Sequence, residues 1–155
     1  MKIVMNTSPV IFLGKIGCLH LLRQCVTEVI IPEAVLQELG DYNLPDFIKI
    51  KVLSATGTAY VRGALGQLHQ GELSAIVLAQ ELLANFVILD DLLARRKAQR
   101  LQINVMGTLG LLLLMKKSSI ITPQQTWCCI DELINAHGMY LSKDMIAQLH
   151  KSIMM

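Results

Sequence analysis

Charged and aromatic side chains are scarce in this sequence. Asp, Glu, Lys and Arg make up 17% of its 155 residues and aromatic residues only 5%, whereas 53% of the residues are apolar. Intrinsic disorder requires low hydrophobicity and high net charge, so it is excluded. Few aromatic residues also argue against recognition of single-stranded nucleic acid by base stacking. Because the net charge is only +2, any nucleic-acid contact must come from a local basic cluster.

Long apolar runs and ordered cysteine motifs are also missing. The longest apolar stretch, Val105 to Met115, contains two glycines and stops at Lys116, which is too short for the roughly 20 residues of a membrane span. The N-terminal segment is interrupted by Asn6 and Ser8 and has no small-residue cleavage site, so we expect no signal or transit peptide. The four cysteines lack C-x-x-C spacing, which favours reduced thiols. These features predict a cytoplasmic protein with no membrane partner.

Short apolar runs alternate with helical patterns from the N-terminus to about residue 116. This alternation predicts an α/β fold of three layers, α/β/α, with a mainly parallel central sheet of four or five strands. No repeat or linker interrupts the chain and its length suits one domain, so we predict a single domain over 1–155. We expect strands at 2–5, 28–31, 47–53, 86–89 and 103–106, and helices at 17–25, 32–39, 60–68, 72–84, 92–101, 107–115, 123–136 and 142–153.

Polar side chains stand where the strands and helices of such a sheet meet. Function in open α/β sheets collects beyond the carboxyl ends of the strands. There we place Asn6 after the first strand, Glu38 on the helix after the second, Glu72 at the start of the central helix, and Asp90 with Asp91 after a later strand. Each has an ordinary alternative as a helix cap, a first-turn acid or a solvated residue. Hard divalent cations prefer oxygen ligands, so their joint occurrence favours a site for Mg²⁺ or Mn²⁺.

The densest basic cluster lies on the helix that follows the acidic pair. It consists of Arg95, Arg96, Lys97 and Arg100. A solvated helix face is the ordinary interpretation. The alternative is that these side chains bind phosphates of a nucleic acid beside the acidic site, since neutralised phosphates supply most nucleic-acid affinity.

Four motifs together resemble one known family. They are N-T-S-P at 6–9, P-x-x-V-x-x-E-L at 32–39, G-E-x-x-A-I-x-L-A at 71–79 and D-D-x-x-A-R-x-x-A at 90–98. In this order and spacing, the motif-bearing core 1–117 resembles the PIN-domain superfamily, and in particular a branch of short prokaryotic PIN-like proteins. The C-terminal helices at 123–153 lie outside these motifs.

The resemblance implies a PIN-like fold and a metal-dependent ribonuclease that hydrolyses RNA phosphodiester bonds. It also implies a toxin-like component of a type II toxin–antitoxin pair, with a small antitoxin protein as partner and a homodimer as its assembly. Ser8 would supply a hydroxyl that lies next to the ligands and does not itself bind the ion. The resemblance does not decide which Asp of the adjacent pair binds the ion. The residues it implies as catalytic and as ligands of Mg²⁺ or Mn²⁺ are Asn6, Glu38, Glu72, Asp90 and Asp91.

Asn6 departs from the family pattern, in which most PIN nucleases have Asp. An amide oxygen can bind a metal ion but brings no charge. The alternative function is therefore a catalytically weak or silent PIN-like module that binds nucleic acid or protein. A receiver-like signalling domain is disfavoured, because it needs an acidic pair where this sequence has Asn6, Thr7 and Ser8.

Overall fold

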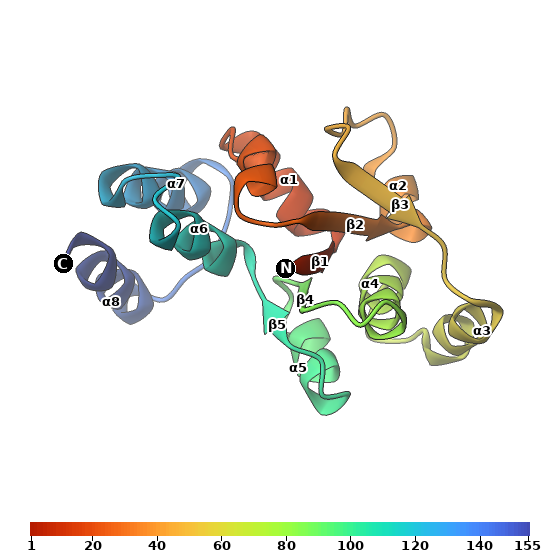
Figure 1. Cartoon of the computed structure of the whole chain (residues 1–155). Coiled ribbons are helices and arrows are strands. Elements are labelled where there is room, and N and C mark those ends of the chain that lie inside the picture. Colours follow the sequence, from red (N-terminus) through yellow and green to blue (C-terminus); the bar gives the residue numbers. More distant parts are fainter.

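A five-stranded sheet lies at the centre of the computed structural model, which describes all residues from 1 to 155 (Figure 1). Every pair of neighbouring strands is parallel, and the strand order is β3-β2-β1-β4-β5. This confirms the expected α/β architecture and places β1 in the middle. The strands are β1 (Lys2–Met5), β2 (Glu28–Pro32), β3 (Ile48–Lys51), β4 (Phe86–Ile88) and β5 (Val105–Met106).

Most helices agree with the sequence expectations, and three segments differ. The helix at Thr7–Lys15 was not expected; its Pro9 lies in the first turn, where the missing N–H costs no hydrogen bond. The segment expected as a helix at 17–25 is a shorter 3₁₀ helix, and the one expected at 60–68 begins earlier, where the Ser54 side chain accepts from Gly57 N at 3.0 Å. The helices are α1 (Thr7–Lys15), η1 (Leu19–Gln24), α2 (Glu33–Leu39), α3 (Ala55–Ala64), α4 (Gln70–Glu81), α5 (Leu92–Arg100), α6 (Thr108–Lys117), α7 (Pro123–Ala136) and α8 (Lys143–Met154).

The central strands are buried on both faces, because successive side chains point to opposite sides of the sheet. In β1, Ile3 and Met5 pack in the larger core with residues of α1, α6, α7 and α8, whereas Val4 packs in the second core with α4 and α5. Figure 1 shows α1 and α6 to α8 on one side of the sheet and α4 with α5 on the other. The high apolar content thus fills two main cores, one on each side of the sheet, and a small third cluster formed by Val61, Leu73 and Val77 between α3 and α4.

Helix α4 runs antiparallel to the strands beside it. At its C-terminal end, the Lys2 ammonium group at the start of β1 donates to Leu82 O at 3.2 Å. Its residues from Leu73 to Ala79 are all buried, so the helix is held firmly against the sheet and against α2 and α3. This direction places the N-terminus of α4 at the carboxyl ends of β1 and β2.

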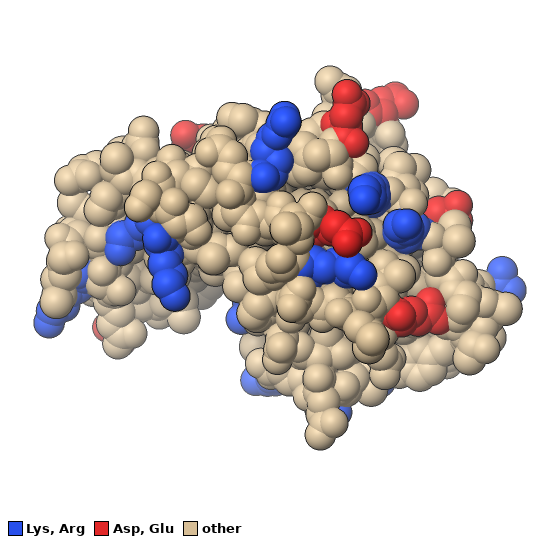
Figure 2. All heavy atoms as spheres, in the orientation of Figure 1, with Lys and Arg blue, Asp and Glu red and all other residues tan.

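Charged side chains are spread thinly over the surface. On the face seen in Figure 2, basic and acidic side chains are interleaved over the half that contains the sheet, and acidic ones are sparse over α6 to α8. This face therefore presents no continuous region of one sign. None of the helices is long and apolar enough to cross a membrane.

All four cysteines are free thiols, as the absence of a disulfide pattern predicted. Cys18 and Cys129 lie with their sulfur atoms 3.6 Å apart, where the segment before η1 meets α7. The hydrogen bond from Cys129 lowers the pKa of the Cys18 thiol. The contact helps to join the C-terminal helices to the rest of the larger core.

Candidate functional site

The carboxyl edge of the sheet gathers residues from distant parts of the chain. Asn6 follows β1, and its backbone N–H donates to Ile88 O in the neighbouring β4 at 3.1 Å. Asp90 and Asp91 follow two and three residues after Ile88, the last residue of that strand. Helix α2 brings Glu38 to the same edge, and the first turn of α4 brings the fourth acid. Parallel pairing of β1 with β4 thus brings together residues that are more than 80 positions apart in the sequence.

Glu38 is held between the start of α1 and the first turn of α4. The Thr7 hydroxyl donates to Glu38 Oε2 at 2.5 Å. On its other side Glu38 lies against Gly71, so closely that a Cβ atom at that position would overlap Oε1. Thr7 was not among the predicted site residues, although it stands in the middle of the N-T-S-P motif.

Glu72 lies within reach of the charges of two other carboxylates. Its Oε2 accepts from His69 N at 3.2 Å across the first turn of α4. Partial burial is the main cause that raises its pKa, and the negative charges of Asp91 and Glu38 raise it further. Asp91 and Glu38 therefore both repel the ionised Glu72 carboxylate, and a cation at this edge would relieve that repulsion.

The adjacent aspartates have different environments. Asp90 accepts two hydrogen bonds from Thr108 at the start of α6, from N at 2.8 Å and from Oγ1 at 2.7 Å. Asp91 is exposed and uses one oxygen, Oδ2, to cap α5 through Ala94 N at 3.0 Å. Both aspartates lie at the edge where they were expected. Of the two, only Asp91 raises the pKa of Glu72 by its negative charge.

Asn6 offers an unpaired oxygen at this edge. The residue is only 5% exposed, and its Oδ1 is the one buried side-chain oxygen or nitrogen atom of the chain without a hydrogen-bond partner. Buried polar atoms are normally paired, because an unpaired one costs about 1–3 kcal/mol. Ser8, two residues on, is exposed in the first turn of α1. An unpaired acceptor at the same sheet edge as the carboxylates is available to a ligand.

The basic cluster on α5 is divided between two directions. Arg95 Nη1 donates to Leu89 O at 3.4 Å. The same nitrogen and Asp90 Oδ1 both lie close to Gly107, where they would contact a Cβ atom. Lys97 instead lies over the ring of Tyr60 on α3, 5.7 Å from its centroid. Arg96 and Arg100 are exposed. Of the predicted basic residues, Arg95 is the one placed beside the acidic edge.

The oxygen atoms at this edge suit a hard divalent ion. No three His, Cys, Asp or Glu side chains in the chain lie close enough together to surround one ion by themselves. Mg²⁺, however, keeps several waters and needs only one or two direct carboxylates. The set contains only oxygen donors, and the Asn6 amide oxygen is already desolvated and unpaired. These residues therefore fit an ion held partly through water.

Comparison with known families gives one match. A family model described as a PIN domain matches residues 2–154. No curated protein and no solved structure matches the chain. The matched range includes α7 and all of α8 in addition to the four motifs.

Proposed function

The chain belongs to the PIN-domain family, and from this premise we propose that it is a metal-dependent ribonuclease that hydrolyses RNA phosphodiester bonds. The observation that carries the proposal is that Glu38, from another helix, and Asp91, from the end of β4, both lie near enough to Glu72 for their charges to act on it, while Thr7 and Gly71 hold Glu38 at this edge. It is supported by the unpaired Asn6 oxygen at the same edge. PIN domains are nuclease-like modules that generally depend on divalent metal ions, and this chain has the oxygen donors for one.

We assign Glu38, Glu72 and Asp91 as the anionic ligands of Mg²⁺ or Mn²⁺, and Asn6 as a neutral ligand. When bound, the ion lowers the pKa of a water molecule and neutralises charge that develops on the phosphate. Thr7 orients Glu38 through its hydrogen bond. We keep the prediction that the Ser8 hydroxyl lies next to the ligands without binding the ion itself.

We assign Asp90 a positioning role, because both of its carboxylate oxygens accept hydrogen bonds from Thr108. It ties the exit of β4 to the start of α6 and so fixes the segment that carries Asp91. Arg95 lies next to this segment and is the candidate to contact a phosphate of the RNA. Arg96, Lys97 and Arg100 extend the nucleic-acid-binding proposal along α5.

The test is cleavage of a structured RNA by the purified protein. We expect cleavage with Mn²⁺ and none with EDTA. Asp91→Asn should reduce the rate by about 100-fold or more, because it removes a ligand charge, while Asn still caps α5 as well as Asp does. Asp46→Asn removes the same charge from an exposed loop and is the matched control. Cleavage that survives in EDTA or in Asp91→Asn contradicts the assignment.

A second candidate is a catalytically weak or silent module that binds nucleic acid or protein. Asn6 favours it, because the amide leaves the site with one negative charge fewer than an Asp would give. The same assay separates the two functions: a silent module binds RNA in a filter or anisotropy measurement but leaves the strand intact with Mn²⁺.

We further propose that the protein is the toxin-like member of a type II toxin–antitoxin pair in the cytoplasm. This rests on the motif resemblance, which also implies a small inhibitory partner and a homodimer. Light scattering on the purified protein measures the assembly. Coexpression with small proteins encoded beside it tests for inhibition of the cleavage described above.

Gly71→Ala should lower the cleavage rate by about 10–100-fold with little change in stability. The added Cβ overlaps Glu38 Oε1, so the carboxylate must move and its bond from Thr7 is lost; small displacements of catalytic groups have effects of this size. Ala gains about 0.5–1 kcal/mol over Gly in a helix, which offsets the lost hydrogen bond of similar size. Steady-state cleavage and thermal unfolding measure the two effects.

The control for this change is Gly63→Ala. Gly63 lies in α3, and a Cβ there meets no atom within 4 Å. It should leave cleavage unchanged. Wild-type activity in Gly71→Ala would contradict the role of Glu38.

A further inference from the structure

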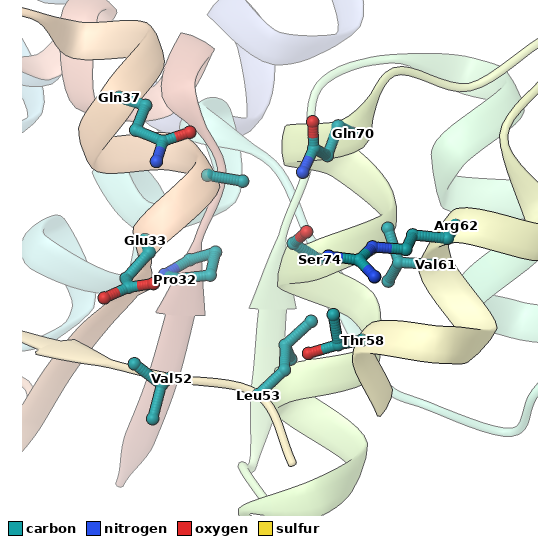
Figure 3. A pocket seen from close by; sticks show the side chains of 11 residues that line it. Pro32, Glu33, Gln37, Val52, Leu53, Thr58, Val61, Arg62, Gln70 and Ser74 are labelled. Carbon is teal, nitrogen blue, oxygen red and sulfur yellow. The ribbon is translucent and has the colours of Figure 1, made fainter. Parts of the chain in front are cut away.

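A cavity of about 170 Å³ lies between α2, α3 and α4 (Figure 3). Side chains of α2 form one wall and those of α4 the opposite one, while α3 and the segment after β3 close the remaining sides. None of its lining residues belongs to the metal-binding set proposed above. The labelled lining residues are Pro32, Glu33, Gln37, Val52, Leu53, Thr58, Val61, Arg62, Gln70 and Ser74.

The cavity adjoins the acidic site along two helices. Gln37 directly precedes Glu38 on α2, and Gln70 directly precedes Gly71, which lies against Glu38. The backbone at one end of the cavity therefore continues directly into Glu38 on α2 and into Gly71, which contacts Glu38, on α4. This neighbourhood allows an RNA strand with a phosphate at the acidic site to place an adjacent nucleotide at the cavity.

The polar groups of the cavity are free to bind a ligand. In Figure 3 the Arg62 side chain reaches from α3 across the opening toward Ser74, and the amides of Gln37 and Gln70 face each other. Arg62 takes part in neither of the two ion pairs and in no side-chain hydrogen bond of the structure. A guanidinium group has five donors and no acceptor, so it requires a ligand with acceptor atoms.

The shape and charge of the lining favour a nucleobase over a phosphate. Glu33 contributes a carboxylate to the wall, which repels an anion. Leu53 and Val61 supply apolar contact for the faces of a flat ring. The volume is below the roughly 300 Å³ at which pockets for drug-sized molecules begin, so it suits a single ring system.

We propose that this cavity holds one guanine base of the RNA strand, next to the phosphate that is cleaved. Arg62 donates to the O6 and N7 acceptors of guanine, the commonest bidentate contact between an arginine and a base. Glu33 accepts from the N1 and N2 donors on the other edge. Among the four bases, guanine alone presents both a pair of neighbouring acceptors, O6 and N7, and a pair of neighbouring donors, N1–H and N2–H₂. The inference rests on the proposed ribonuclease function, because it names the base that this site selects.

The experiment is a titration of the full-length protein with each of the four nucleoside 5′-monophosphates, without divalent ions, followed by two-dimensional NMR. Guanosine monophosphate should shift the signals of Gln37, Arg62 and Gln70 at concentrations at least about tenfold lower than the other three nucleotides. Arg62→Gln should weaken this binding by about tenfold or more, the size of one bidentate pair. Arg23→Gln, an exposed arginine of η1 on the other side of the sheet, removes the same charge and should leave binding unchanged.

Three results would overturn the assignment. They are equal shifts with all four nucleotides, the same shifts with inorganic phosphate alone, and unchanged guanosine monophosphate binding in Arg62→Gln. The two proposals can fail separately. Binding of guanosine monophosphate without any RNA cleavage would contradict the ribonuclease proposal and support the base-binding cavity. RNA cleavage without nucleotide binding would contradict the cavity assignment alone.

Discussion

Glu72→Gln should abolish metal-dependent cleavage of RNA and leave the metal-free protein at least as stable as the wild type. The rate should fall by about 100-fold or more, because a charged ligand is lost. The fold is spared because Gln, like Glu, serves at the third position of a helix in the capping arrangement that Glu72 makes with His69 N. Stability should rise by up to about 1 kcal/mol, the size of interactions between partly exposed charges, since the cost of partly burying an ionised carboxylate is removed together with its repulsion by Asp91 and Glu38.

This gain in stability should depend on pH. The pKa of Glu72 lies above its ordinary value in the folded protein, so the folded state holds the proton more tightly than the unfolded state. Ionised Glu72 therefore destabilises the fold, and the penalty grows as the pH rises from about 4.3, the ordinary carboxyl pKa, through the higher folded value. In thermal unfolding, Glu72→Gln and the wild type should have the same Tm at low pH, and the variant should have the higher Tm at neutral pH.

Divalent ions should reverse this order. Binding to the folded state raises the Tm by mass action, so added Mn²⁺ should raise the Tm of the wild type more than that of Glu72→Gln. Glu81→Gln, an exposed acid at the other end of α4, provides a matched control for the metal response. An equal response to Mn²⁺ in wild type and Glu72→Gln would show that Glu72 does not bind the ion.

Asp90→Ala should destabilise the protein far more than Asp91→Ala, although the two residues are adjacent. Asp90 is half-buried and accepts two hydrogen bonds from Thr108, whose side chain is fully buried. Their loss leaves the Thr108 hydroxyl unpaired and should cost about 2–4 kcal/mol. Asp91 is exposed and caps α5 through one bond, so its loss should cost about 1 kcal/mol. For a chain of this length the Tm difference is several degrees, at about 2–4 °C per kcal/mol.

The cleavage assay should show the opposite order for two milder changes. Asp90→Asn keeps acceptor capacity toward Thr108 and should retain part of the activity, whereas Asp91→Asn keeps the cap but loses the charge near Glu72. If Asp90→Asn is the less active of the two and stays fully folded, Asp90 is the metal ligand and the assignment of the pair must be exchanged.

The strands and the edge they form could be predicted from sequence because each strand is short, apolar and buried on both faces. The runs at 2–5, 28–31 and 86–89 all lie within a residue or two of the observed strands. The helix at Thr7–Lys15 was missed, because its apolar residues and Pro9 conceal the 3.6-residue period. The start of α3 was missed because glycine-rich sequence obscured the Ser54 cap.

The positions of the site residues could be predicted, but their contacts could not. Parallel pairing of β1 with β4 makes Asn6 and Asp91 neighbours whatever their side chains do. The hydrogen bonds from Thr108 to Asp90 depend on where α6 packs. This helix begins 17 residues after Asp91, and no local sequence pattern reveals its placement. The division of the basic cluster between Arg95 and Lys97 likewise depends on where α3 packs.

The strand order of the sheet also has a consequence for how the protein is made. β1 pairs with β2, which follows it closely, and with β4, which is about 80 residues further along the chain. Pairings between such distant segments form slowly, and during synthesis they must wait for the later strand to leave the ribosome. Asn6 and Glu38 emerge early, but Asp91 joins them only when β4 has been inserted beside β1. A nascent chain shorter than about 90 residues therefore carries no complete acidic site, and any nuclease activity first arises after Asp91 has left the ribosome.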